Sequence, residues 1–87
     1  MSDNRKLFVA NLPFAADDED LVDLFGEFGD VIDTKVIREN GGRSRGFGFV
    51  TFATAIEAQA ALELDGAQYG SRILAVKIAE PRKYGKG

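Results

Sequence analysis

The segment 45–52, Arg-Gly-Phe-Gly-Phe-Val-Thr-Phe, limits the possible folds of this chain more than any other segment. Its aromatic and β-branched residues favour a strand, in which successive side chains point to opposite faces of a sheet. One face then carries Arg45, Phe47, Phe49 and Thr51, and the other carries Gly46, Gly48, Val50 and Phe52. Because the two glycines leave room for a close approach, we expect an alanine-lined helix to cover the second face. The two rings of the first face would then stand open beside a cation.

Taken alone, this pattern leaves a second interpretation open, a strand buried on both faces with all three rings in a core. The order of the residues favours the open face. The octamer resembles the signature of the RNA recognition motif (RRM), Lys/Arg-Gly-Phe/Tyr-Gly/Ala-Phe-Val-x-Phe/Tyr, at every specified position. Segment 7–12, Leu-Phe-Val-Ala-Asn-Leu, resembles the second, six-residue signature of the same family and puts Phe8 on the face opposite Leu7 and Val9.

The remaining apolar patterns predict two helices. Asp17 is expected to cap the first helix, whose acidic first turn suits the helix dipole, and Gly29 to end it. Thr54 and Glu57 match a capping box that opens the second helix, which ends at 65–66. The expected buried stripes are Leu21, Leu24, Phe25 and Phe28 in the first helix and Ala58, Ala61 and Leu62 in the second.

Strands are predicted at 6–11, 31–37, 45–53 and 73–79. The loop 38–44 contains Asn-Gly, a frequent hairpin sequence, and 67–72 is predicted to be a turn region with a short extra strand. The resulting β-α-β-β-α-β order predicts a ferredoxin-like α+β sandwich, with a four-stranded antiparallel sheet and both helices on one face. We expect a frayed segment at 1–5, one domain at 6–80 and a basic tail at 81–87.

Composition excludes several kinds of function. The chain has 87 residues, 45% of them hydrophobic and 29% charged, which is typical of one small soluble domain. It has neither cysteine nor histidine, so disulfides, the usual zinc sites and histidine-based triads are excluded, and we expect no metal and no cofactor. No apolar run approaches the ~20 residues of a membrane helix, and the N-terminus lacks a signal-peptide core. We therefore expect an intracellular protein, cytoplasmic or nuclear, with no membrane partner.

The distribution of charge says more than its total. A net charge of −3 and a pI of about 4.8 argue against a non-specific nucleic-acid binder. All eleven Lys and Arg residues, however, lie at 5–6, 35–45 and 72–86, whereas seven acidic residues crowd into 17–30. We interpret this as an acidic back and a more basic front. Two solvated helix surfaces with ordinary charged loops are the simpler alternative.

The resemblance to the RRM family implies a binding site on the open face, built on the two signature strands. It implies that Phe8 and Phe49 each stack under a base, that Phe47 packs against ribose and that Arg45 pairs with a phosphate. Further cations expected at or near this face are Lys35, Lys77, Arg43 at the hairpin tip, and Arg82 and Lys83 in the tail. Asp33 and Glu80 would weaken the attraction of phosphate there. Asn11 is expected to hold the turn after its strand.

These features predict a monomer that binds single-stranded RNA with micromolar affinity and single-stranded DNA more weakly. A protein–protein module is the alternative, because some splicing-factor relatives of this fold bind tryptophan-bearing peptides and have an acidic first helix. Those relatives carry Arg-x-Phe after the second helix, whereas this chain has Arg-Ile-Leu at 72–74. An acylphosphatase-like enzyme is a third interpretation. Segment 11–13, Asn-Leu-Pro, is no phosphate cradle, so we expect no catalytic residues and no enzyme.

Overall fold

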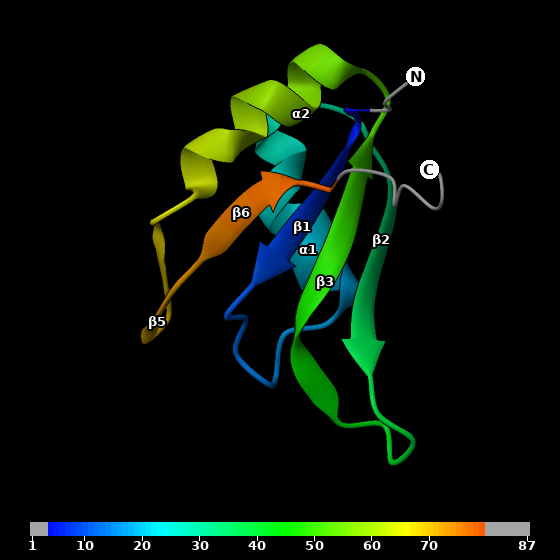
Figure 1. Cartoon of the computed structure of the whole chain (residues 1–87), viewed down its shortest axis with the longest axis vertical. Helices are drawn as coiled ribbons and strands as arrows, with labels where there is room; N and C mark the ends of the chain where they lie inside the picture. The colour runs from blue at the N-terminus through cyan, green and yellow to red at the C-terminus, as the bar shows by residue number, and fades with distance from the viewer. Residues whose placement is uncertain (1–3, 80–87) are drawn as a thin grey trace, which may run out of the picture.

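The computed structural model describes residues 4–79 and has the predicted fold class. The main elements are β1 (Lys6–Ala10), α1 (Asp18–Phe25), β2 (Val31–Arg38), β3 (Ser44–Phe52), α2 (Ala55–Ala61) and β6 (Ala75–Ile78). The four strands form one antiparallel sheet in the order β2-β3-β1-β6 (Figure 1). A small hairpin of β4 (Gln68–Tyr69) and β5 (Arg72–Ile73) fills the predicted turn region.

Both helices begin as the sequence predicts. Asp17 accepts a hydrogen bond from the Asp20 amide at 3.0 Å, and the Asp20 carboxylate accepts one from the Asp17 amide at 3.0 Å. Thr54 and Glu57 form the same reciprocal pair at 3.2 Å. In both helices the last turn is a 3-10 helix, at Gly26–Phe28 and Leu62–Leu64, and the helical segments end at Gly29 and Asp65 as expected.

One face of the sheet packs against the helices to form the core. Leu7 and Val9 of β1 and Val50 and Phe52 of β3 have no exposed surface. The helices contribute Leu21, Phe25, Ala58 and Ala61, which are equally buried. The predicted assignment of the strand faces is therefore confirmed, and the helices lie against the face opposite Phe8, Phe47 and Phe49 (Figure 1).

The reason for the two signature glycines differs from the prediction. A Cβ atom on Gly48 would lie 2.6 Å from the Lys35 carbonyl oxygen of β2, and one on Gly46 would lie 3.6 Å from the Leu12 carbonyl oxygen. Neighbouring backbone, not an alanine-lined helix, thus approaches these glycines. Gly46 also has a φ of 84°, a left-handed conformation that glycine adopts at little cost.

The predicted hairpin between β2 and β3 is present. The amide of Glu39 donates to the Arg43 carbonyl at 2.9 Å, and the amide of Gly42 donates back to the Glu39 carbonyl at 2.8 Å. Gly42, with a φ of 85°, is the left-handed residue of this three-residue loop. Asn40 and Gly41 therefore do not form the two-residue turn that an Asn-Gly pair often makes.

Part of the acidic run in α1 is structural. The Asp18 carboxylate accepts a hydrogen bond of 2.7 Å from the Val36 amide, at the end of β2 where the pairing with β3 shifts register. Asp65 does the same for the Val76 amide of β6 at 2.9 Å. These carboxylates satisfy strand amides that no neighbouring strand reaches, so they are not merely solvated surface charges.

Two of the predicted segments, 1–5 and 81–87, are described only in part or not at all. Residues 1–3 and 80–87, which hold most of the predicted N-terminal segment and all of the predicted tail, lie outside the described residues. Within 4–79, no helix is both long enough and apolar enough to cross a membrane. Over the same residues, no three acidic side chains are placed to hold a metal ion.

Candidate nucleic-acid interface

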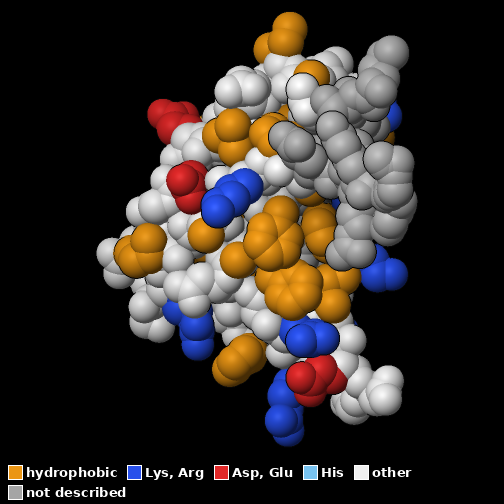
Figure 2. All heavy atoms as spheres, in the orientation of Figure 1, with side chains coloured by type: hydrophobic (Ala, Val, Ile, Leu, Met, Phe, Trp, Pro, Cys, Tyr) orange, Lys and Arg blue, Asp and Glu red, His pale blue; other side chains and the backbone are white. Residues whose placement is uncertain are grey.

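The pairing of β1 with β3 brings three rings together from distant parts of the chain. Phe8 lies directly opposite Phe49, and Ala10 lies opposite Phe47. The ring centroid of Phe8 is 5.5 Å from that of Phe47 and 5.6 Å from that of Phe49, with planes inclined by 47° and 54°. We call these three residues the aromatic patch. It lies at the centre of the sheet face turned away from the helices (Figure 2).

The rings of the aromatic patch are half-buried, whereas we expected them to stand fully open. Two kinds of contact cover part of their surface. The rings pack against one another at tilted angles that suit aromatic pairs. In addition, the Lys6 ammonium lies 4.9 Å from the centroid of Phe49, and the Arg45 guanidinium lies 5.8 Å from that of Phe47. A partly exposed ring flanked by a cation still offers a surface for stacking.

Cations surround the aromatic patch on several sides. Lys35 of β2 lies opposite Phe49, and Lys77 of β6 lies opposite Phe8, and both side chains are exposed. Figure 2 shows Lys and Arg side chains around the hydrophobic centre of this face. Sequence reasoning missed Lys6. Strand alternation was a sufficient signal, because Lys6 precedes Phe8 by two positions and so shares its face.

The other predicted site residues are less closely associated with the patch. Arg43 is exposed in the hairpin turn, outside the paired part of β2 and β3. Asp33 lies opposite Thr51 and next to Lys35 on the same face, as expected. Arg82, Lys83 and Glu80 lie outside the described residues.

Asn11 has the structural role that the sequence suggested. Its backbone is left-handed, with a φ of 64°. Its side-chain amide donates to the Ile73 carbonyl at 2.8 Å, and its side-chain oxygen accepts from Arg72 Nη1 at 2.8 Å. Asn11 therefore joins the end of β1 to the β4–β5 hairpin.

A hollow that the sequence analysis did not predict borders the aromatic patch. It has a volume of about 320 Å³, and we call it the end hollow. Its lining residues are Phe8, Ala10, Asn11, Leu12, Phe14, Arg45, Gly46, Phe47 and Arg72. The Arg72 guanidinium lies 5.3 Å from the ring centroid of Phe14, which forms part of the rim. Sequence reasoning missed both residues because neither belongs to a signature.

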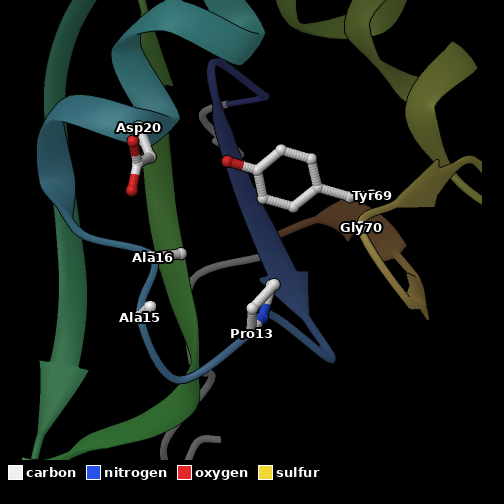
Figure 3. A pocket seen from close by; sticks show the side chains of 6 residues that line it. All are labelled: Pro13, Ala15, Ala16, Asp20, Tyr69 and Gly70. Atoms are coloured by element: carbon white, nitrogen blue, oxygen red, sulfur yellow. The ribbon is translucent and has the colours of Figure 1, made fainter.

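A smaller hollow of about 180 Å³ lies between α1, the loop that precedes it and the β4–β5 turn (Figure 3). Tyr69 extends across it towards α1, and Pro13, Ala16 and Asp20 line the opposite side. Burial raises the pKa of the Tyr69 hydroxyl above its usual 10.0, and the negative charges of Asp20, Asp17 and Asp23 raise it further. Ligand pockets usually exceed about 300 Å³, so this hollow is small for a ligand site.

The fold and the site together define a ferredoxin-like domain with an aromatic, cation-flanked sheet face. The family described as the RNA recognition motif matches residues 7–75. Since this match covers most of the 87 residues, the chain belongs to the RNA recognition motif family.

Two curated relatives from Arabidopsis thaliana are similar to almost the whole chain. Glycine-rich RNA-binding protein 8 is 44% identical over 84 residues, which cover 94% of this chain and 50% of that protein. Glycine-rich RNA-binding protein 2, mitochondrial, is 48% identical over 92 residues, which cover 97% of this chain and 58% of that protein. The chain thus spans about half the length of these relatives.

A solved Sxl-lethal protein/RNA complex has the same fold. It superposes with a TM-score of 0.82 at 34% sequence identity and covers 87% of this chain and 48% of that one.

Proposed function

We propose that this domain binds single-stranded RNA by stacking bases on Phe8 and Phe49, with ribose against Phe47. One observation carries the proposal. Three rings from two adjacent strands form a partly exposed cluster on the sheet face that the helices leave uncovered. A cluster of large apolar rings on a surface marks a site of interaction, and bases stack on such rings without regard to sequence. The RNA-binding names of the two relatives and the solved protein/RNA complex support the same ligand class.

The cations around the aromatic patch would contact the phosphates. Arg45 and Lys6 lie over the rings themselves, and Lys35 and Lys77 flank them from the neighbouring strands. Arg43, Arg82 and Lys83 would add to the positive field from the hairpin and the tail. With a net charge of −3 and Asp33 on the same face, we expect a micromolar dissociation constant and a shallow dependence on salt.

Single-stranded RNA suits the aromatic patch better than double-stranded RNA does. The bases of an RNA helix are stacked on one another inside it, so a flat sheet can stack only on bases that are splayed out. We propose that the domain acts as a monomer of residues 6–80, that it binds single-stranded DNA more weakly, and that it binds without catalysing a reaction. An intracellular location, in an organelle or elsewhere, is consistent with such a ligand.

The peptide-binding alternative has less support. In that interpretation, an Arg-x-Phe sequence after the second helix would recognise the partner, but this chain has Leu74 in place of the phenylalanine, and Leu74 is buried. The hollow beside α1, of about 180 Å³, is also below the usual size of a ligand site.

Titration of a fluorescent single-stranded RNA tests the proposal. We expect Phe8→Ala and Phe49→Ala each to weaken binding by roughly 1–3 kcal/mol while the circular dichroism spectrum stays unchanged. Ile56→Ala is the matched control, because Ile56 is 82% exposed on α2, away from the patch. Unchanged affinity in both phenylalanine variants, or tighter binding of duplex than of single strand, would refute the proposal.

A further inference from the structure

We propose that the end hollow, between Phe47 and the Phe14–Arg72 pair, holds one nucleotide beyond those stacked on the aromatic patch. This inference rests on the proposed function and extends its footprint beyond the three rings to Phe14 and Arg72, which lie outside both signatures. The hollow is continuous with the patch, because Phe8 and Phe47 line both. An RNA strand that passes over these rings therefore reaches the end hollow next.

Phe14 is the first reason to assign a ligand. Its side chain is 62% exposed, although its neighbour Leu12 is completely buried. The ring is nonetheless held in place. It lies beside Gly46, where an added Cβ would be 3.8 Å from Phe14 Cε1, and under the guanidinium of Arg72 at 5.3 Å. A large ring that is both exposed and positioned is a better stacking surface than a mobile one, because little freedom is lost on binding.

The backbone around the ring is fixed as well. The Leu12 amide donates to the Gly46 carbonyl at 2.8 Å, which ties the loop after β1 to β3. On the other side, Asn11 binds both the Ile73 carbonyl and Arg72. The walls of the end hollow thus come from three separate parts of the chain that hydrogen bonds hold together.

The size and charge of the end hollow suit a nucleotide. About 320 Å³ is at the lower end of the range for small-ligand sites, which suits a single base with its sugar. Among the described residues that line it, two are arginines and none is acidic. An arginine has five N–H donors, so Arg72 can bind Asn11 and still contact a phosphate. A stacking ring beside a guanidinium is the combination that recognises an unpaired nucleotide.

A length series of oligouridylates of two to eight nucleotides tests the inference. For the wild type, we expect affinity to rise with length, with one added nucleotide occupying the end hollow. Phe14→Ala should leave the binding of the shortest oligonucleotide unchanged and weaken that of the longer ones by about tenfold. Ile56→Ala, a truncation of an even more exposed side chain on α2, should follow the wild type at every length.

A crosslinking experiment on the wild type avoids any effect of the substitution on folding. Oligonucleotides with 5-bromouridine at either end are irradiated in the complex, and the modified peptide is identified by mass spectrometry. We expect one of the two ends to crosslink within residues 11–14 or at Arg72.

The outcomes separate this inference from the proposed function. If Phe8→Ala weakens binding as proposed but Phe14→Ala matches the wild type at every length, only the inference fails. It fails too if Phe14→Ala weakens all lengths equally, since the ring would then support the patch and not an additional nucleotide. If the wild type binds no oligonucleotide, the proposed function itself is wrong.

Discussion

A Cβ atom added to Gly48 would lie 2.6 Å from the carbonyl oxygen of Lys35. Gly48 is buried in the middle of β3, and the atoms in its way belong to the backbone of β2, which cannot move without disturbing the sheet. The glycine of the signature is thus required for the pairing of two strands that carry site residues, Phe49 on one and Lys35 on the other.

We therefore expect Gly48→Ala to lower the free energy of unfolding by about 1–3 kcal/mol, the usual cost of overpacking. Urea denaturation followed by circular dichroism measures it. Gly41→Ala is the control, because nothing lies within 4 Å of a Cβ atom at that position. Equal stability of the two variants would show that β2 yields to the added methyl group.

The left-handed conformation of Asn11 leads to a second prediction. Asn11→Ala loses the side-chain hydrogen bonds to Ile73 and Arg72 and places an unsuitable residue at a φ of 64°, whereas Asn11→Gly loses only the hydrogen bonds. We expect a destabilisation of about 2 kcal/mol for alanine and about 1 kcal/mol for glycine. Thermal unfolding compares them, and a glycine variant less stable than the alanine variant would contradict this explanation.

Tyr69 provides a prediction about pH. Its pKa in the folded protein is raised above 10.0 by burial and by the nearby carboxylates. The unfolded chain therefore loses this proton first as the pH rises, so the contribution of Tyr69 to stability is complete below pH 10 and is lost above it. Absorbance at 295 nm, recorded on a Tyr84→Phe variant, should show Tyr69 titrating above pH 10 when folded and near 10 in urea. A folded midpoint at or below the unfolded one would contradict the assignment.

Sequence reasoning was accurate where local patterns determine the structure. The capping residues Asp17 and Thr54 and the alternation of faces in β3 depend only on near neighbours, and the structure confirms them. The adjacency of Phe8 and Phe49 came from the family resemblance, since spacing along a chain does not determine which strands pair. It too is confirmed.

The features that sequence reasoning missed depend on contacts between distant segments. The end hollow requires the β4–β5 hairpin to lie beside the loop after β1, which puts Arg72 over Phe14. Gly48 was assigned to the wrong neighbour because a glycine indicates a close approach but not what approaches. The position of Lys6 over Phe49 likewise depends on the side-chain conformation, which strand alternation does not determine.

Lys6 should contribute to binding mainly through its charge. We expect Lys6→Gln to weaken RNA binding and to reduce the slope of log K against log salt by about 0.7, the value for one phosphate on a single strand. Gln59→Glu changes the net charge by the same amount on the exposed surface of α2 and is the control. Equal effects of both variants on affinity and slope would mean that Lys6 acts only through the overall charge of the domain.

The most direct test of base stacking removes the bases and keeps the phosphates. Isothermal titration compares a single-stranded RNA with an abasic strand of the same length, using the wild type and the Phe8→Ala/Phe49→Ala double variant. We predict that the wild type loses roughly 1–3 kcal/mol of binding energy per stacked base removed, and that the double variant loses much less. Equal affinity of the wild type for the two strands, or an equal loss in both proteins, would contradict the account.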